Sequence, residues 1–328
     1  MNQRLAQEMD FYDFCEVVHD HSKIFHYYTV KYLESKIRLL GVTSIHDFFS
    51  QYIGKVCREK NTVVKILSLG AGNCDFEIDI AKTLLKSGVQ NFVIDCMEIN
   101  PNMLERGKKS AEAENILKYF LFTVCDINEW AKDLDDCDCV DVVMANQTLH
   151  HLTELERIFD KIFGILSRDG YFLVSDLVGK NGHMRWPEAL DVCNSLWKLL
   201  DDKYKYNNIW KRVDANYFDW DCSYSGFEGI RSQDILGLLI EKFGFELFFA
   251  WGNIADSFVI GFYGPNFDVK SKLDTAIIDF IAEIDEEKIE NGEVKPTHLL
   301  AAMTKNPCKK TRCYKNLTPK FCFRDPLA

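Results

Sequence analysis

The chain has 328 residues, of which 47% are hydrophobic and 13% aromatic, and its formal net charge is −11. This composition is typical of a globular protein rather than a disordered one, and the length allows one large core with appendages or two smaller domains. The acidic charge disfavours a duplex-binding protein, and the apolar runs are shorter than the roughly 20 residues that a membrane span needs.

The two ends of the chain bear on location and partners. The first residues, MNQRLAQEMDFYDF, lack the basic flank and apolar stretch of a secretory signal, so we expect a cytoplasmic protein with no membrane partner. Basic residues gather only between Lys305 and Lys320, and such a run is usually a solvated, mobile end. A nucleic-acid partner is therefore disfavoured, and a homodimer is left open.

No metal site is expected. The twelve cysteines form no C-x-x-C pair. His298, Cys308, Cys313 and Cys322 could imitate a zinc set near the C-terminus, but their spacing matches no usual ligand pattern.

Residues 1–60 are predicted to form an N-terminal helical segment, because Phe25, Tyr28 and Tyr32 fall near helical spacing. From residue 62 onward apolar strands alternate with helical segments. Five strands are predicted, at VVKILSL, NFVIDCMEI, KYFLFTVCD, CVDVVMAN and YFLVSDL. This rhythm indicates βαβ units and a parallel sheet covered on both faces.

Residues 179–229 interrupt the rhythm and are predicted to be an inserted helical cap over a substrate. A helix, RSQDILGLLIEKFGF, and two strands, ELFFAW and DSFVIGFYG, follow, and the short link GNIA makes the two strands antiparallel. The predicted fold is α/β, a Rossmann-like doubly wound seven-stranded sheet whose last strand is antiparallel. The sheet domain takes residues 61–178 and 230–263, and residues 264–328 form a helical extension and a basic tail.

The ends of the predicted strands carry the chemistry, because ligands of such sheets bind beyond the carboxyl ends of the strands. The first strand ends in the turn Gly70-Ala71-Gly72, which allows backbone to approach a ligand closely. The second ends at Glu98, whose carboxylate can accept both hydroxyl hydrogens of a ribose, and the third at Asp126. The fourth ends at Asn146-Gln147.

This order of strand ends, followed by LHHL, resembles the class I S-adenosylmethionine-dependent methyltransferases, over residues 62–178 and 230–263. The segments GHMRWPEAL, GFEGIRSQDIL and GPNFD resemble a bacterial branch of that family, to which no substrate is assigned. The resemblance implies S-adenosyl-L-methionine as cofactor. It implies that the methionine part lies over Gly70 and Gly72 and borders Asn146 or Gln147, that Glu98 holds the ribose, and that Asp126 with Ile127 frames the adenine. Ala71 and Ile99 are also expected to bind the cofactor.

The chain departs from the family at two positions. Ser68 stands where the family has an acid before the first glycine, and Cys74 stands where it has a third glycine. A nicotinamide-binding turn would instead need a glycine at Asp75, which counts against a dehydrogenase.

Methyl transfer needs a base only where the nucleophile carries a proton at neutral pH. His150, His151 and Asp176 are the candidate catalytic residues, since they follow the fourth and fifth strands. One of two adjacent histidines can equally well pack the following helix. An acceptor pocket is expected at His183, Arg185, Trp186 and Arg231, where an arginine could clamp a carboxylate and aromatic rings could face a planar molecule or simply attach the cap.

The sequence therefore favours methylation of an oxygen or nitrogen atom in a small-molecule acceptor. A protein or RNA methyltransferase is an alternative, encouraged only by the basic tail. A catalytically silent fold that binds S-adenosylmethionine is a third hypothesis.

Overall fold

The computed structural model describes residues 22–132, 139–224 and 226–327. The helical prediction for residues 1–21 and the reading of the N-terminal residues as lacking a secretory signal lie outside these ranges. In the described part of the chain, no helix combines the length and apolar content needed to cross a bilayer.

A mixed eight-stranded sheet forms the centre of the protein, in the order β10-β8-β9-β5-β4-β1-β2-β3. The strands are β1 (Val64–Leu69), β2 (Phe92–Glu98), β3 (Phe120–Val124), β4 (Val140–Asn146), β5 (Leu166–Leu177), β8 (Gly244–Trp251), β9 (His298–Thr304) and β10 (Arg312–Cys313). Strands β1 to β5 run parallel, and β9 is antiparallel to both β5 and β8. The predicted doubly wound α/β fold is confirmed, with eight strands rather than seven.

Helices cover both faces of the sheet, because alternate residues of a strand point to opposite sides. In β1, Ile66 belongs to one buried cluster and its neighbour Leu67 to another. The first cluster is completed by α4 (Ile45–Glu59), α5 (Asp75–Lys86) and α6 (Pro101–Ala113), and the second by α7 (Ile127–Trp130), α8 (Leu155–Ile165), α10 (Ser232–Lys242) and α13 (Pro319–Cys322).

The antiparallel strand is β9, and the prediction that placed it at DSFVIGFYG is wrong. That run instead contains helix α11 (Asp256–Val259). The carboxylate of Asp285 accepts the backbone N–H groups of residues 253–255 at 3.0–3.1 Å, which turns the chain out of the sheet directly after β8. Phe258 and Val259 are apolar because they are buried in the cap rather than in a strand.

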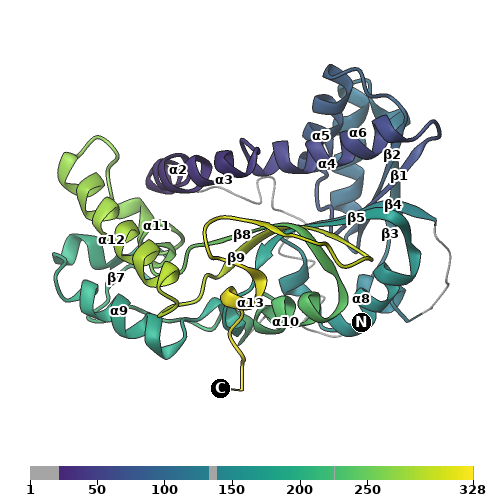
Figure 1. Ribbon diagram of the computed structural model, residues 1–328. Helices are drawn as coiled ribbons and strands as arrows, with labels where there is room; N and C mark the ends of the chain where they lie inside the picture. The colour runs from purple at the N-terminus through teal and green to yellow at the C-terminus, as the bar shows by residue number, and fades with distance from the viewer. Residues whose placement is uncertain (1–21, 133–138, 225, 328) are drawn as a thin grey trace.

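The cap has its own buried core and is larger than the predicted segment 179–229. It combines α2 (Lys23–Tyr28), α9 (Pro187–Trp197), α11 and α12 (Lys272–Glu290), with the small hairpin β6 (Tyr206–Asn207) and β7 (Arg212–Val213). The short helix α3 (Ser35–Ile37) lies in the segment that connects α2 of the cap to α4 of the sheet domain. Figure 1 shows α9, α11 and α12 gathered at one end of the sheet, away from α5 and α6.

The C-terminal segment is packed, contrary to the prediction of a mobile tail. Strand β10 pairs with β8 through Arg312 opposite Leu247 and Cys313 opposite Phe248. Leu317 is also buried in the core under the sheet, together with Cys322 of α13. The sheet and its core thus use residues expected to lie in a separate extension.

Candidate functional site

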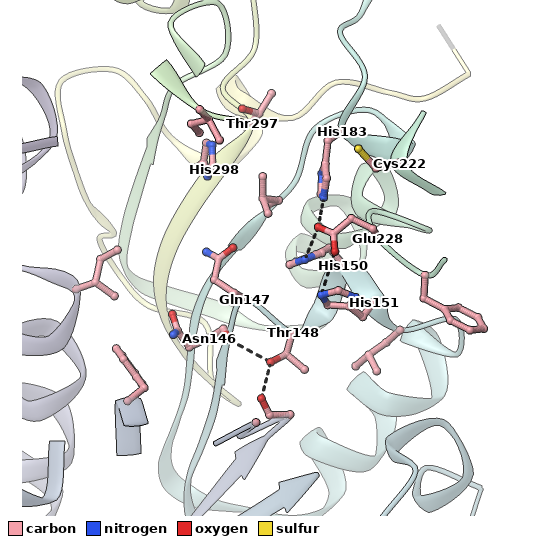
Figure 2. Close-up of a pocket in the computed structure, with 18 of the residues that line it drawn as sticks. Asn146, Gln147, Thr148, His150, His151, His183, Cys222, Glu228, Thr297 and His298 are labelled. Carbon is pink, nitrogen blue, oxygen red and sulfur yellow. Dashed lines mark hydrogen bonds and ion pairs between the residues drawn. The ribbon is translucent and has the colours of Figure 1, made fainter. Parts of the chain in front are cut away.

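One cavity of about 1410 Å³ lies at the carboxyl ends of β1, β2 and β4 and extends under the cap. Figure 2 shows the part of its wall that is formed by the ends of β4 and by the cap. All nine residues expected to bind the cofactor line this cavity: Gly70, Ala71, Gly72, Glu98, Ile99, Asp126, Ile127, Asn146 and Gln147.

The glycine turn after β1 is fixed against the end of β4. Gly70 and Gly72 both have positive φ, and a Cβ on Gly70 would lie 2.5 Å from a methyl carbon of Thr148. The Thr148 hydroxyl donates to the carbonyl of Leu69 at 2.9 Å. Cys74 takes the left-handed conformation, with φ 60°, at the place of the family's third glycine. Cys74 therefore adopts the backbone conformation that a glycine would favour at this position of the turn.

Two carboxylates at neighbouring strand ends are held in place by backbone groups. Glu98 accepts the N–H of Gly72 at 3.1 Å and that of Asn100 at 3.0 Å. Asp126 caps α7 and accepts the N–H of Asn128 at 2.9 Å. Since an ionised carboxylate offers about four lone-pair sites, both acids keep capacity for hydroxyl or amino groups of a ligand.

Glu77 is a cavity residue that the sequence reasoning missed. Its Oε1 accepts the hydroxyl of Ser68 at 2.6 Å, and its Oε2 is buried without a hydrogen-bond partner. Burial raises the pKa of Glu77 to about 7, against the lowering effect of the Ser68 hydrogen bond. The acid that the family carries on the first strand is thus replaced here by a serine on β1 and an acid on α5.

This donor set fits the nucleoside cofactor that the family resemblance implies. The positive-φ glycines leave room for a ligand against backbone, and Glu98 can accept two hydroxyl hydrogens. The orphaned oxygen of Glu77 lacks a hydrogen-bond donor, which an ammonium group would supply.

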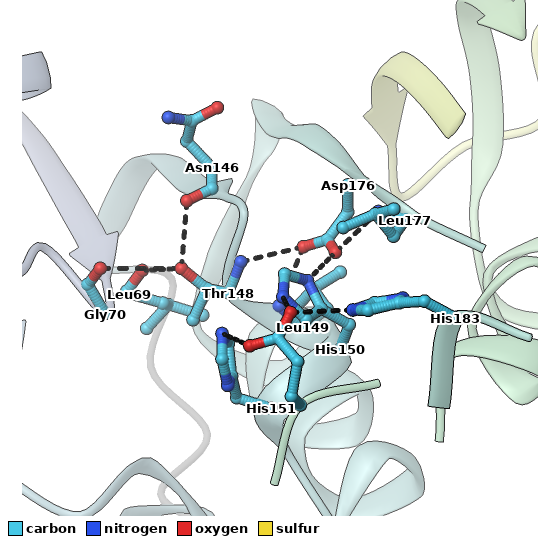
Figure 3. Close-up of polar contacts among 11 residues, drawn as sticks. Leu69, Gly70, Asn146, Thr148, Leu149, His150, His151, Asp176, Leu177 and His183 are labelled. Carbon is cyan, nitrogen blue, oxygen red and sulfur yellow. Dashed lines mark hydrogen bonds and ion pairs between the residues drawn. The ribbon is translucent and has the colours of Figure 1, made fainter. Parts of the chain in front are cut away.

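Asp176, predicted as a candidate base, positions the end of β4 and is not among the residues that line the cavity. Its Oδ2 accepts the N–H groups of Thr148 and Leu149 at 2.9 and 2.7 Å. Its Oδ1 lies 2.6 Å from Nδ1 of His150 and accepts the N–H of Leu177 (Figure 3). With both oxygens engaged and the side chain fully buried, Asp176 orients His150.

His150 and His151 do line the cavity, and they meet Glu228 from the cap. Glu228 Oε1 lies 3.4 Å from Nε2 of His150 and 2.7 Å from Nε2 of His183, and its Oε2 lies 3.5 Å from Nε2 of His151. Figure 2 shows the four side chains together. We call His150, His183 and Glu228 the histidine–glutamate cluster.

The charges of this cluster are interdependent. Burial lowers the pKa of His150, but the carboxylates of Asp176 and Glu228 outweigh burial and raise it to about 10. Burial would raise the pKa of Glu228, yet the hydrogen bonds of His150 and His183 hold it well below its ordinary value. At neutral pH His150 therefore holds a proton opposite an ionised Glu228, which is not the state of a ready general base.

The cap supplies a cation and aromatic rings to the cavity. Arg185 is buried; its Nε donates to the hydroxyl of Ser257 at 3.1 Å and its Nη1 to the carbonyl of His183 at 3.0 Å. Within the described ranges Arg185 makes no direct ion pair; burial disfavours its charge, but the nearby charges of Asp256 and Asp219 contribute to raising the pKa of its guanidinium. The cap also lines the cavity with the aromatic rings of Tyr217, Phe218, Trp220, Phe262 and Tyr263.

Two residues predicted for the acceptor pocket lie elsewhere. Arg231 binds Glu156 through both terminal nitrogens at 2.7 Å and Asp234 at 2.8 Å, and it does not line the cavity. Trp186 also lies outside the cavity and packs against Arg324, whose guanidinium carbon is 4.0 Å from the ring centroid. The other two residues predicted for the acceptor pocket, His183 and Arg185, do line the cavity.

Glu228 was also missed as a site residue. It stands between Gly226 and Gly229 in GFEGIRSQDIL, one of the segments that resemble the bacterial branch of the family. An acid between two glycines in such a segment is the signal that could have identified it.

The family comparison matches a methyltransferase-domain model to residues 60–236, more than half of the chain. No curated protein sequence matches. Among solved structures, a geranyl diphosphate C-methyltransferase of Streptomyces coelicolor has 10% identity, covers 93% of this chain and 99% of its own, and has a TM-score of 0.46. A Galdieria sulphuraria protein assigned as a sarcosine dimethylglycine methyltransferase has 13% identity, 79% and 83% coverage and a TM-score of 0.45. The [4+2]-cyclase SpnF has 12% identity, 78% and 81% coverage and a TM-score of 0.42.

Proposed function

The chain belongs to the class I S-adenosylmethionine-dependent methyltransferases, and from this membership we propose that it methylates an oxygen or nitrogen atom of a small molecule held under the cap. When bound, S-adenosylmethionine supplies an electrophilic methyl group on a sulfonium sulfur. The work left to the protein is to align the acceptor with that methyl group and to exclude water.

We assign the donor side of the cavity to the predicted cofactor residues and Glu77. Glu98 holds the ribose hydroxyls, and Asp126 with Ile127 frames the adenine. Glu77 accepts a hydrogen bond from the amino group of the methionine part, which gives its orphaned Oε2 a partner. Asn146 and Gln147 border the same end of the donor.

The acceptor side rests on Arg185, which is the observation that carries the proposal. The buried guanidinium of Arg185 makes no direct ion pair in the described chain, although the carboxylates of Asp256 and Asp219 are close enough to favour its charge. It lies in the wall of the same cavity as the donor residues, where its remaining N–H groups could bind an anion. The aromatic side chains that line the same cavity suit a planar body. The acceptor is therefore a small, planar molecule with a carboxylate or phosphate group.

The cap favours a small molecule over RNA or protein. Residues of α2, residues within 217–222 and 227–228, and residues of α11 contribute to the cavity wall. A wall of this kind leaves less room for a macromolecule than an open groove would. The net charge of −11 also opposes RNA binding.

Turnover with matched acceptor panels tests this proposal. The protein is incubated with S-adenosylmethionine and with small aromatic carboxylates or phosphates, their neutral esters, peptides or RNA, and S-adenosylhomocysteine release is measured. We expect release with the anionic small molecules, and an Arg185→Met variant should raise their KM about 10- to 150-fold, which is the loss of one charge-assisted hydrogen bond. The donor dissociation constant should stay unchanged.

Two outcomes would contradict the proposal. Turnover confined to peptides or RNA would make the enzyme a macromolecular methyltransferase. Donor binding without turnover on any panel would indicate a catalytically silent fold. Arg185→Lys, which keeps the charge but not the planar fork, should lie between the wild type and Arg185→Met.

A further inference from the structure

We propose that the histidine–glutamate cluster, His150, His183 and Glu228, binds a divalent transition-metal ion, of which zinc fits best. Their ligand atoms all lie within 4.8 Å of one another. In a tetrahedral zinc site with bonds of about 2.0–2.1 Å, ligand atoms are about 3.3 Å apart. The separation from Glu228 Oε1 to Nε2 of His150, 3.4 Å, already matches that value, whereas the 2.7 Å to Nε2 of His183 would have to lengthen by about 0.6 Å.

The ring of His150 is already oriented for coordination. Its Nδ1 lies 2.6 Å from Asp176 (Figure 3), and its Nε2 lies 3.4 Å from Glu228 Oε1 (Figure 2). The ion would displace the proton that Nε2 holds in the metal-free protein. Metal-binding histidines usually donate their other ring N–H to a carboxylate in this way, which fixes the tautomer and the ring plane. Asp176 would therefore support the ion without touching it.

The three ligands come from separate segments that the backbone holds together. The N–H of Gly182 donates to the carbonyl of Gly229 at 2.9 Å, and the N–H of Ile230 donates to the carbonyl of His150 at 3.0 Å. A Cβ on Gly229 would lie 3.0 Å from Gly182 N, so only glycine permits this approach. His183 itself has φ 57°, a conformation that costs free energy in any residue but glycine. The cluster is thus a built feature of three loops.

The ligand types select the ion. Two imidazole nitrogens and one carboxylate suit zinc and related transition metals, whereas magnesium prefers oxygen ligands. Three protein ligands leave at least one coordination position for an acceptor oxygen, whose pKa the ion would lower. That catalytic role rests on the proposed function, but metal binding does not. The sequence predicted no metal site because these ligands follow no local spacing motif.

Zinc titration of the full-length, chelator-treated protein tests the proposal. Calorimetry and metal analysis should show one Zn²⁺ per chain, and Mg²⁺ should give no binding. His183→Ala and Glu228→Gln should each weaken zinc binding by more than about 100-fold, and Asp176→Asn by about 10- to 100-fold, as for other outer partners of metal ligands. Co²⁺ in place of zinc should give visible absorption bands that His183→Ala abolishes.

The matched control is His26→Ala, since His26 lines the same cavity outside the cluster and its loss should leave zinc binding unchanged. Binding of S-adenosylhomocysteine by each variant checks that it is folded. Absence of zinc binding in the wild type, or equal binding in the wild type, His183→Ala and Glu228→Gln, would overturn the metal site. If S-adenosylhomocysteine still binds in that case, the methyltransferase function stands without it.

Discussion

The carboxylate of Glu98, at the end of β2, accepts the backbone N–H of Gly72, in the turn after β1, at 3.1 Å. The other carboxylate oxygen accepts the N–H of Asn100 at 3.0 Å. The acid and the glycine turn therefore form one rigid wall of the cavity. A ligand that binds the acid meets the turn without any further ordering of these residues.

Replacing Glu98 with alanine should weaken the binding of S-adenosylhomocysteine about 10- to 150-fold, equivalent to about 1.5–3 kcal/mol, because charge-assisted bonds to the ribose are lost. Isothermal calorimetry measures the change. Glu98→Gln keeps the shape and one acceptor oxygen, so its loss should be smaller. An unchanged dissociation constant in Glu98→Ala would mean that the ribose assignment is wrong.

Glu77 should make the stability of the ligand-free protein fall as pH rises. Burial raises its folded pKa to about 7, above the unfolded value of 4.5. Between these two pH values the folded state binds more protons than the unfolded state, so the free energy of unfolding decreases with pH, by about 3 kcal/mol in all. Below pH 4.5 and above pH 7 this group adds no slope.

Urea unfolding at pH 5 and pH 8 measures that decrease, and Glu77→Gln should remove most of it. The variant should be the more stable protein at pH 8 but should bind S-adenosylhomocysteine more weakly, because a neutral amide cannot pair with an ammonium group. Equal donor affinity in the two proteins would contradict the amino-group assignment. The same pH slope in both would contradict the raised pKa.

Gly107 of α6 leaves space for the side chain of Cys74, which follows the glycine turn. A Cβ on Gly107 would lie 2.7 Å from Sγ of Cys74 and 2.8 Å from the carbonyl oxygen of Asn73. Alanine normally stabilises a helix interior by about 1 kcal/mol relative to glycine, but overpacking of this kind costs about 1–3 kcal/mol. We therefore expect Gly107→Ala to lower the free energy of unfolding.

The control is Gly54→Ala in α4, where the three atoms nearest to the added Cβ all belong to the flexible end of Arg58, the closest at 3.1 Å. That change should be neutral or stabilising in the same urea experiment. If Gly107→Ala stabilised the protein as much as Gly54→Ala, the close contact between α6 and the turn would be refuted.

The gathering of the predicted cofactor residues at one cavity could be predicted because its signals are local. Each of Gly70, Glu98 and Asp126 directly follows an apolar run, and parallel neighbouring strands bring their carboxyl ends to one edge of a sheet. The pairing of Ser68 with Glu77, which replaces the single acid of the family, was missed because the two residues lie on different elements, a strand and the helix that follows it. Only the 2.6 Å contact shows that the two positions act together.

The features that the sequence did not predict depend on contacts between segments that are distant in the chain. Asp285 of α12 accepts hydrogen bonds from residues 253–255 and so ends β8. Because Asp285 lies 30 residues further along the chain, no local sequence pattern predicts this contact. Strand β9 contains Ala301 and Ala302, whose helix propensity hides a buried strand. Glu228 reaches His150 only because Gly182 and Gly229 allow two loops to touch.

Deleting residues 305–328 should destabilise the protein, since this segment is part of the core. The deletion removes β10 from the edge of the sheet and exposes the sites of Leu317 and Cys322, each less than 5% exposed. Loss of the buried Leu317 side chain alone costs about 1.5–3 kcal/mol. Urea unfolding of the truncated chain should show that loss, and a stability within about 0.5 kcal/mol of the full chain would refute the packing of this segment.

The charge of the same segment is tested without deletion, by replacing the exposed Lys309, Lys310 and Lys320 with glutamine. Surface changes of this kind alter stability by less than about 0.5 kcal/mol, so the fold and the donor site should be untouched. A small-molecule methyltransferase should keep its turnover. An enzyme that acts on RNA should instead lose acceptor affinity and show a shallower salt dependence, because each lost phosphate contact reduces the number of counterions released. Measuring KM against salt concentration for the wild type and this triple variant therefore separates the two acceptor classes, and unchanged curves exclude a role of these lysines in binding RNA.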